Sequence, residues 1–319
     1  MEYTIVGDAG LYVSKVILGT ASYRSSRWQE WILEEEAALP LLKHAFDVGI
    51  NTWDTVRKLL ARALKMHSIP RGQVVFLTKI FYALDPEGQG PISSLKDKTN
   101  RHLVNRVGLS RKHIFAAVTE STQRLGTYID VLQIHRLDRE CNLTETMKAL
   151  HEVVESGRVR NLGASSMATW EFQKLQYIAE RKGWHKFISM QNYYNLLYRE
   201  EREMIPFCRD SGVGILPWSP LARDTKREQT DKLLTSLVRG RETTSDGIIV
   251  SRVQEIAKKR GVKMSTIALA WSMRQGMCPI TGLCSTARID EAVQAVASQL
   301  SEDEAAYLEE PYPPKEVAY

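Results

Sequence analysis

Three titratable side chains stand at the ends of short apolar runs in the first half of the chain. Asp54 lies near the end of INTWDT, Lys79 ends VVFLTK and His135 ends IDVLQIH. A carboxylate, an ammonium and an imidazole held together can move a proton and stabilise charge on a substrate oxygen. Each also has a common structural explanation, as a helix cap, a solvated cation or a core histidine. Their shared position favours a catalytic group.

Three later runs end in small polar groups or a flat aromatic ring. They contain Ser165 and Ser166 in GASS, Gln191 in MQNYYNLL, and Trp218 followed by Ser219 in PWSPLAR. Amide and hydroxyl groups can hold a carboxamide, and an indole can stack on a planar heterocycle. Together these residue types are suited to binding a nicotinamide ring.

The segment GLCSTARIDEAV has the features of a phosphate site. Ser285 precedes a helical pattern, and Arg288 lies in its first turn. Backbone N–H groups at a helix start, a hydroxyl and a guanidinium bind phosphate well. An ordinary capped helix with Arg288 on its surface is the alternative interpretation, so this assignment depends on the other residues.

These side chains require a fold that brings the run ends together. Eight runs rich in β-branched residues predict strands, each followed by a helical pattern. The predicted strands are 15–21, 50–55, 74–79, 129–135, 159–165, 187–192, 213–219 and 277–283. Apolar strands that alternate with helices indicate parallel strands covered on both faces. Eight such units predict a (β/α)8 TIM barrel, whose C-terminal strand ends form one rim.

The N-terminal segment and the helical patterns complete the predicted fold. The opening YTIVGDAGLYVSK alternates about GDAG, so we expect an N-terminal β-hairpin that covers the lower end of the barrel. Helices are predicted over segments such as 34–49, 143–157, 170–183 and 250–261, several of which end in Gly. No low-complexity linker or shift in composition marks a second domain. We therefore expect residues 1–319 to form a single domain.

Composition narrows the classes of partner. Hydrophobic residues make up 43% and charged residues 25%, as in a globular protein with a large core. The net charge of +5 is dispersed, and the basic stretch 106–113 predicts a solvated helix start rather than a nucleic-acid patch. The four cysteines lack metal or disulfide spacing, and the sequence has neither a membrane-spanning run nor a leader pattern. We expect a cytoplasmic protein without a metal, and no apolar stripe indicates an oligomer.

The chain resembles the aldo-keto reductases, in particular the fungal aryl-alcohol dehydrogenase and short-chain aldehyde reductase branch. The matching segments are VSKVILGT, GINTWDT, VVFLTK, YIDVLQIHRLD, ESGRVRNLGASS, SMQNYYNLLYREEREMIPFC, GVGILPWSPLAR and RIDEAV. They cover essentially the whole chain. The resemblance implies a TIM barrel that binds NADPH and reduces an aldehyde or ketone by hydride transfer. The fungal branch adds the expectation of an aromatic aldehyde or a secondary-metabolite ketone.

The resemblance also assigns roles. The family uses an Asp, Tyr, Lys and His tetrad, of which Asp54, Lys79 and His135 match three members. Ser166 stands where many relatives have Asn, and Arg288 favours NADPH over NADH. The positions that the resemblance implies for cofactor binding are Ser165, Ser166, Gln191, Trp218, Ser219, Leu221, Arg223, Ser285, Arg288 and Glu291.

Two loops of the family pattern have no counterpart in this sequence. Family members continue from the DT into a loop A-x-x-Y-G, whose tyrosine donates the proton. Here Thr55 runs directly into VRKLLARALK, and no residue matches that tyrosine. A second gap follows PWSPLAR, where relatives carry a loop over the pyrophosphate. The omission of whole loops between intact motifs is typical of a skipped exon or a shifted splice boundary.

Three functions remain open. The first is an impaired NADPH-dependent carbonyl reductase, in which His135, a water held by Lys79, Tyr23 or Tyr82 replaces the missing acid. The second is a catalytically inactive NADP(H)-binding scaffold or sensor, as in the reductase-like β subunits of potassium channels. The third is a Schiff-base enzyme that uses Lys79, which leaves the aromatic and phosphate-binding positions unexplained. We expect the first.

Overall fold

The computed structural model describes residues 1–23, 32–54, 57–84, 91–92, 101–221 and 243–317. Eight parallel strands form one sheet in the order β11, β10, β9, β8, β5, β4, β3 and β12. Their bounds are β3 Ile17–Gly19, β4 Thr52–Asp54, β5 Val75–Ile80, β8 Ile129–Ile134, β9 Val159–Ser165, β10 Phe187–Gln191, β11 Gly214–Ile215 and β12 Ile280–Gly282. Each predicted run overlaps one of these strands, and only β5 extends beyond its run, by one residue, so the predicted set is confirmed.

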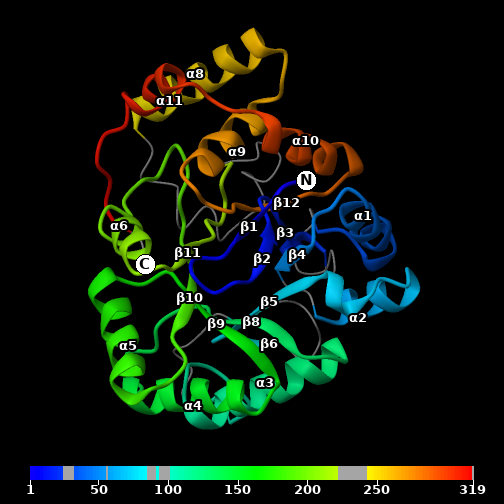
Figure 1. Ribbon diagram of the computed structural model, residues 1–319, viewed down its shortest axis with the longest axis vertical. Coiled ribbons are helices and arrows are strands. Elements are labelled where there is room, and N and C mark those ends of the chain that lie inside the picture. Colours follow the sequence, from blue (N-terminus) through cyan, green and yellow to red (C-terminus); the bar gives the residue numbers. More distant parts are fainter. Residues whose placement is uncertain (24–31, 55–56, 85–90, 93–100, 222–242, 318–319) are drawn as a thin grey trace.

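Backbone hydrogen bonds between the two ends of the sheet close it into a barrel. The Cys278 N–H donates to the Ile215 carbonyl at 3.0 Å, and the Ile280 N–H donates to the Pro217 carbonyl at 2.8 Å. Ile280 also pairs with Trp218, which lies just beyond β11. The predicted (β/α)8 architecture is therefore confirmed, with the helices arranged around the strands (Figure 1).

The helices follow the predicted alternation. Their bounds are α1 Glu35–Asp47, α2 Arg57–Met66, α3 Arg111–Leu125, α4 Leu143–Glu155, α5 Thr169–Lys182, α6 Met204–Asp210, α8 Thr244–Arg260, α9 Met264–Arg274, α10 Thr286–Ala297 and α11 Glu302–Glu309. Gly183 and Gly261 end α5 and α8 in the left-handed conformation that glycine adopts without strain. The basic stretch 106–113 contains the start of α3, where the Ser110 hydroxyl accepts from the His113 N–H. His113 itself is buried, contrary to a fully solvated helix start.

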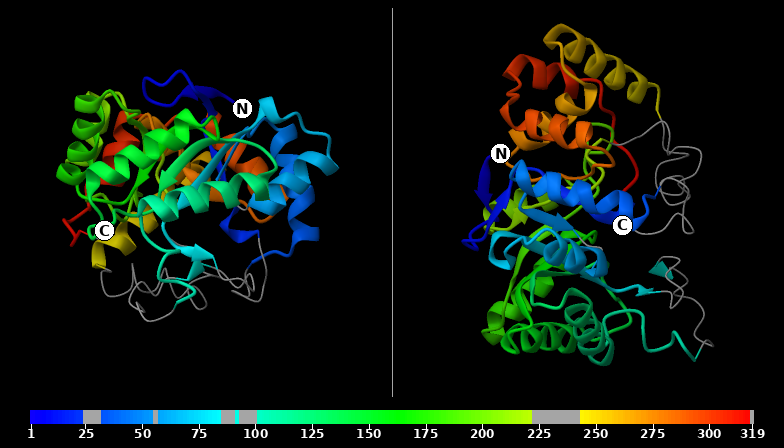
Figure 2. Two further views of the ribbon diagram at one scale, coloured as in Figure 1. Left: turned by 90° about the horizontal axis from the view of Figure 1, so that it is seen from below. Right: turned by 90° about the vertical axis from the view of Figure 1, so that its right-hand side faces the viewer.

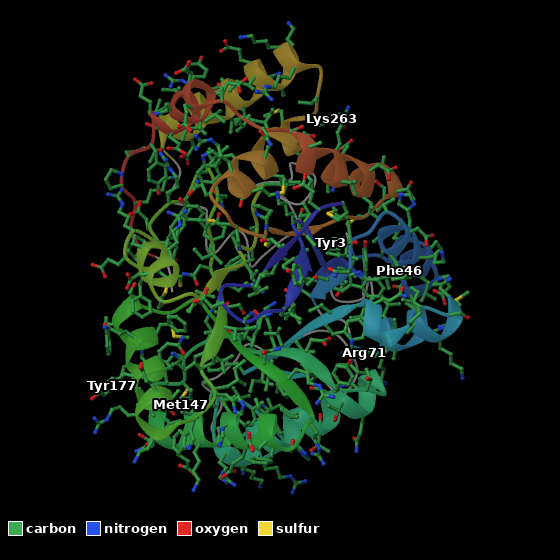
Figure 3. All side chains as sticks on the ribbon, in the orientation of Figure 1. Tyr3, Phe46, Arg71, Met147, Tyr177 and Lys263 are labelled. Carbon is green, nitrogen blue, oxygen red and sulfur yellow. The ribbon has the colours of Figure 1, made fainter. Side chains whose placement is uncertain are left out.

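Two apolar layers hold the barrel together. One lies between the strands and the helices, where Met147 of α4 is buried, whereas Tyr177 of α5 faces outward (Figure 3). The second fills the barrel and includes Leu77, Val131 and Ile280. Burial of apolar surface on both faces of the strands is what makes a parallel sheet of this kind stable.

The predicted N-terminal hairpin is confirmed. Strand β1 (Tyr3–Ile5) pairs antiparallel with β2 (Tyr12–Ser14). Val6 and Val13 of the hairpin belong to the apolar cluster inside the barrel. The hairpin therefore covers the N-terminal end of the barrel, where it lies to one side of the molecule (Figure 2).

The described residues also include short helical and strand elements and free thiols. The 3-10 helices are η1 Thr20–Ser22 and η2 Arg71–Gln73, and a second small sheet contains β6 Ala83–Leu84 and β7 Pro91–Ile92. All four cysteines are free thiols. Within the described ranges, no helix has both the length and the apolar character needed to cross a membrane.

Candidate active site

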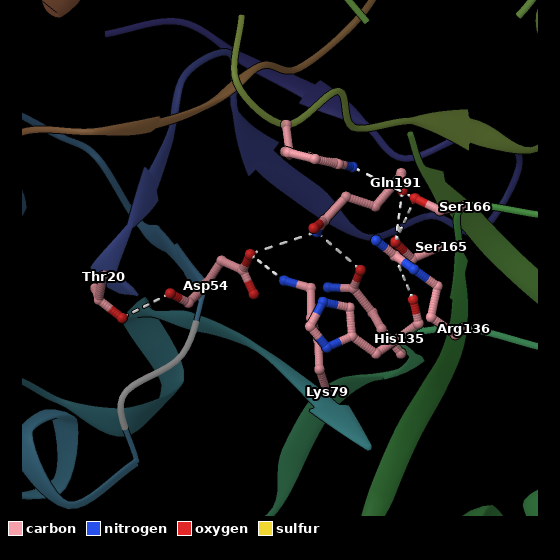
Figure 4. Close-up of polar contacts among 10 residues, drawn as sticks. Thr20, Asp54, Lys79, His135, Arg136, Ser165, Ser166 and Gln191 are labelled. Carbon is pink, nitrogen blue, oxygen red and sulfur yellow. Dashed lines mark hydrogen bonds and ion pairs between the residues drawn. The ribbon is translucent and has the colours of Figure 1, made fainter. Parts of the chain in front are cut away.

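The ends of β4 and β5 form an ion pair at the C-terminal rim. The strand register pairs Asp54 with Leu77, and Lys79 lies two residues further along β5. Alternate residues of a strand share a face, and Leu77 belongs to the interior cluster, so both charged side chains point into the barrel. Lys79 Nζ donates to Asp54 Oδ2, with side chains 17% and 9% exposed respectively (Figure 4). Limited exposure makes the loss of either partner more costly than in an ordinary surface ion pair, because it leaves the other charge buried and unpaired.

Two buried glutamines extend the ion pair across the barrel. Gln191 Nε2 donates to Gln133 Oε1 at 2.9 Å and lies 3.4 Å from Asp54 Oδ2. Gly163 of β9 makes room for this arrangement, because an added Cβ would lie only 2.9 Å from Gln133 Cγ. Gln133 was not predicted as a site residue, although an amide inside the apolar run IDVLQIH was a usable signal.

His135 directly follows β8, and its backbone N–H donates to the Ile80 carbonyl at 2.9 Å. Burial lowers the pKa of His135 well below its usual range, and the nearby positive charges of Lys79 and Arg136 lower it further. The imidazole is therefore neutral at neutral pH. A neutral imidazole can donate a hydrogen bond to a carbonyl oxygen, but it is a poor proton donor.

The two tyrosines considered as substitute acids differ in position. Tyr23 is fully buried and its hydroxyl donates to the Leu283 carbonyl, so its role is in packing the core. Burial also raises the pKa of Tyr23. Tyr82 is partly exposed and packs edge-on against His135, with ring centroids 5.1 Å apart. Only Tyr82 of these two adjoins the predicted catalytic residues.

The predicted nicotinamide-binding residues lie together at the neighbouring strand ends. Ser165 Oγ donates to the Gln191 carbonyl at 2.7 Å, and Trp218 Nε1 lies 3.4 Å from Ser166 Oγ. The Trp218 ring also packs against Tyr193, with centroids 4.7 Å apart. Figure 4 shows both serines beside Gln191, on the opposite side of the ion pair from Thr20. Thr20, which was not predicted, donates to the Asp54 carbonyl at 2.6 Å.

Backbone strain occurs at two of these positions. Ser166 has a φ of +43° and Ser219 a φ of +52°, in the left-handed region that disfavours side chains other than Gly, Asn and Asp. Strain of this kind costs on the order of 1 kcal/mol or more and is concentrated at ligand sites. Asn192 Oδ1 holds the Ser166 N–H at 3.2 Å, and Asn192 Nδ2 donates to buried Glu201. Glu201 was not predicted, and burial raises its pKa to about 7.

The predicted phosphate site lies at the start of α10, which follows β12. Ser285 Oγ accepts from the Arg288 N–H at 3.3 Å, so Ser285 is the helix cap. Arg288 is exposed, whereas Glu291 Oε2 lies 3.3 Å from the Ser265 hydroxyl on α9. Because α10 begins just past the C-terminal end of a barrel strand, this helix start lies on the same face of the barrel as the ion pair.

Of the three remaining predicted cofactor-binding positions, the structure describes two. Ser219 accepts from Asn195 Nδ2 through its carbonyl at 3.1 Å, and Leu221 packs against the core. Arg223 lies outside the described residues. The same is true of Thr55, so the structure does not describe either junction where the sequence lacks a family loop.

These groups fit a nicotinamide dinucleotide. Among the described residues, Asp54 Oδ1 and Gln133 Nε2 are buried without a hydrogen-bond partner, and both belong to the network beneath the rim. Each unpartnered buried group costs about 1–3 kcal/mol, so polar ligand atoms or water would be favoured there. The hydroxyl and amide groups near Trp218 suit a planar carboxamide-bearing ring. The α10 start with Arg288 suits an anionic group.

Comparisons with known proteins agree with this geometry. The profile of the aldo/keto reductase family matches residues 15–312. Versiconal hemiacetal acetate reductase of Aspergillus parasiticus is 53% identical over 339 residues, covering 99% of this chain and 98% of the relative. A putative aryl-alcohol dehydrogenase of Schizosaccharomyces pombe is 46% identical, covering 98% and 96%. A putative aryl-alcohol dehydrogenase of Saccharomyces cerevisiae is 42% identical, covering 97% and 96%.

The alignment with the Aspergillus relative spans 339 positions, which is more than the 319 residues of this chain. The relative therefore carries residues for which this chain has no counterpart. Matches of this extent, together with the barrel and the polar rim, lead to one conclusion: the chain belongs to the aldo/keto reductase family of oxidoreductases.

Proposed function

We propose that this chain is an NADPH-dependent reductase that converts an aldehyde or ketone to an alcohol. The observation that carries the proposal is the Asp54–Lys79 ion pair, which lies at the same rim as neutral His135 and partly exposed Tyr82. Carbonyl reduction places negative charge on the substrate oxygen, and a nearby cation and hydrogen-bond donors stabilise that charge.

The cofactor-binding roles follow from the same face. Ser165, Ser166 and Gln191 provide hydroxyl and amide groups for the carboxamide, and Trp218 provides an aromatic face. The bound cofactor supplies the hydride. Arg288 and the start of α10 bind the adenosine phosphate, and the positive charge of Arg288 favours NADPH over NADH. Arg223 retains its role as a predicted contact.

Tyr82 is our proposed proton donor in place of the family tyrosine. The imidazole N–H of His135 orients the carbonyl oxygen of the substrate, and Lys79 stabilises the negative charge that develops on that oxygen. The Tyr82 hydroxyl transfers its proton to the alkoxide, and solvent then restores the proton to the phenolate. His135 is unsuited to this step because its pKa is lowered well below the usual range, mainly by burial.

The substrate class is proposed from the rim and from the relatives. Tyr82 offers a partly exposed aromatic surface at the rim, which suits a flat substrate. The Aspergillus relative is named for a hemiacetal acetate and two yeast relatives for aryl alcohols. We therefore favour an aromatic aldehyde or an aldehyde in equilibrium with its hemiacetal, in fungal secondary metabolism. The free thiols fit a reducing compartment such as the cytoplasm.

A steady-state assay tests this function. The protein is incubated with NADPH and a panel of aromatic aldehydes, and the alcohol product is identified by chromatography. Alcohol formation supports the reductase. Binding of NADPH without alcohol formation would favour the alternative function, a catalytically inactive NADP(H)-binding scaffold or sensor. Trapping by borohydride would favour the Schiff-base alternative, which the Lys79–Asp54 ion pair opposes because a Schiff-base lysine must react as the neutral amine.

A further inference from the structure

Three side chains of types that bind metals meet on the outside of the barrel, on the segments that lead into β9 and β10. His151 and Glu155 lie four residues apart on α4 and therefore share one helix face. His185 comes from the segment between α5 and β10. One ligand atom from each residue lies within 4.8 Å of the other two. Among the described residues, this is the cluster of His, Cys, Asp and Glu groups with metal-like spacing.

The individual distances describe a site that is nearly formed. His151 Nδ1 and His185 Nδ1 are 2.8 Å apart, and Glu155 Oε1 is 3.7 Å from His185 Nε2. Two ligand atoms of a tetrahedral zinc ion are separated by about 3.3 Å, given metal–ligand bonds of about 2.0–2.1 Å. The two distances reach different nitrogens of His185, and only one of these can bind a given ion, so a rotation of the exposed His185 or Glu155 side chain is needed to bring the three ligand atoms, already within 4.8 Å of one another, into that geometry.

Burial and packing favour ligation by these three residues. The His185 and Glu155 side chains are 40% and 62% exposed, which allows an ion to enter and the side chains to rotate. His151 is partly buried, and its ring stacks on Trp184 with an interplanar angle of 20°. One ligand is therefore pre-oriented while the other two can adjust. In the 2.8 Å contact of the two Nδ1 atoms one nitrogen carries the proton and the other accepts it, so ligation by both requires that ring to change tautomer.

We propose that His151, Glu155 and His185 bind Zn²⁺ or a similar divalent transition metal ion, with water completing the coordination. Two imidazoles and one carboxylate are suitable ligands for such ions, whereas Mg²⁺ and Ca²⁺ prefer oxygen ligands. The ion would join the last turn of α4 to the segment that leads into β10. Those segments lie at the N-terminal ends of the strands, away from the rim, so the role is stabilisation of the fold.

The test uses the full chain after treatment with a chelator. Zn²⁺ is titrated in competition with a chromogenic chelator, and Co²⁺ is used as a spectroscopic probe. We expect one Zn²⁺ per chain, tetrahedral Co²⁺ bands in the visible spectrum, and a melting temperature that rises with Zn²⁺. Glu155→Gln and His185→Gln should each weaken binding by roughly tenfold or more and abolish the rise in melting temperature.

His44→Gln is the matched control, because His44 is likewise a partly exposed histidine that contacts a carboxylate, Asp290, at 2.7 Å. It should leave the zinc affinity unchanged. The proposal is overturned if the wild-type protein binds no zinc below millimolar concentration, or if the Glu155 and His185 variants bind it as tightly as the His44 variant. None of these readouts depends on reductase activity.

Discussion

Lys79 Nζ donates to Asp54 Oδ2 across two neighbouring barrel strands, and both side chains point into the barrel at its C-terminal rim. The arrangement holds a cation where a substrate oxygen would develop charge. Gln191 and Gln133 fix the carboxylate side of the pair, so the position of the cation depends on residues from four strands.

Replacing Asp54 tests this pair directly. Asp54→Asn keeps the shape but removes the carboxylate partner of a largely buried ammonium. We expect a loss of about 3 kcal/mol in the free energy of unfolding, near the lower limit for buried pairs. Aldehyde turnover should fall by about 100-fold. Guanidinium titration and steady-state kinetics measure the two effects.

Lys43→Met is the control for that substitution, because it removes the exposed ion pair between Lys43 and Asp47 on α1. Its cost should stay within about 1 kcal/mol, with unchanged turnover. Equal effects of Asp54→Asn and Lys43→Met would mean that the rim pair has no special role.

Tyr82→Phe tests the proposed proton donor. The substitution keeps the ring that packs on His135 and removes only the hydroxyl. We expect kcat to fall by about 10²-fold or more, with little change in NADPH affinity. Tyr177→Phe, at an exposed ring on α5, should change neither quantity. An unchanged kcat in Tyr82→Phe would assign the proton to another group.

Arg288→Ala tests cofactor preference. A guanidinium that binds phosphate through charge-assisted hydrogen bonds contributes about 1.5–3 kcal/mol, so NADPH affinity should fall by roughly 10- to 100-fold. NADH lacks the additional phosphate, and its affinity should change little. Fluorescence titration with both cofactors measures the difference, and Arg181→Ala on α5 serves as a distant cationic control. A parallel loss for both cofactors would contradict the assignment.

Glu201 predicts a pH dependence of stability. Burial raises its pKa from 4.5 to about 7, so the folded protein favours the protonated carboxyl. The stabilisation is complete below the unfolded value and is lost as pH rises through about 7. Glu201→Gln should therefore flatten the fall in free energy of unfolding between about pH 5 and 8.

The effect of Glu201 is obtained from the difference between the pH profiles of the wild type and the Glu201→Gln variant. Burial lowers the pKa values of His135 and His113, which makes their contribution rise with pH below about 6.5. These histidines are present in both wild type and variant, so the difference in slope isolates Glu201. Identical pH profiles for the two proteins would show that the Glu201 carboxyl titrates as it does in the unfolded chain.

The sequence predicted the barrel because its parallel strands are nearly continuous apolar runs between capped helices. The bounds of four strands were predicted less well, since the runs 15–21 and 50–55 contain only Ile17–Gly19 and Thr52–Asp54 as strands. The run 213–219 contains only Gly214–Ile215 as a strand, and the run 277–283 contains only Ile280–Gly282. Pro217 and Pro279 lie in these runs and have no N–H to donate, so regular pairing is interrupted there.

Site residues that end a strand were predictable from the sequence. Residues that support the site from other parts of the chain were missed. Asp54, Lys79 and Gln191 were found by position, and the structure brings them into one network. The contact of Tyr23 with Leu283 spans 260 positions of sequence, and no local pattern signals it. Glu201 was missed because a buried carboxyl within a charged segment resembles a solvated one.

A single-turnover experiment tests the proposed carbonyl reduction most directly. The protein is first titrated with NADPH by quenching of tryptophan fluorescence, and the loaded protein is then mixed with an aromatic aldehyde while the absorbance of the reduced cofactor is followed. We predict saturable binding and then loss of that absorbance, at a measurable rate that falls in the Tyr82→Phe variant. Saturable binding followed by constant absorbance for every aldehyde would contradict the proposal, because the rim would then hold a cofactor without performing reduction.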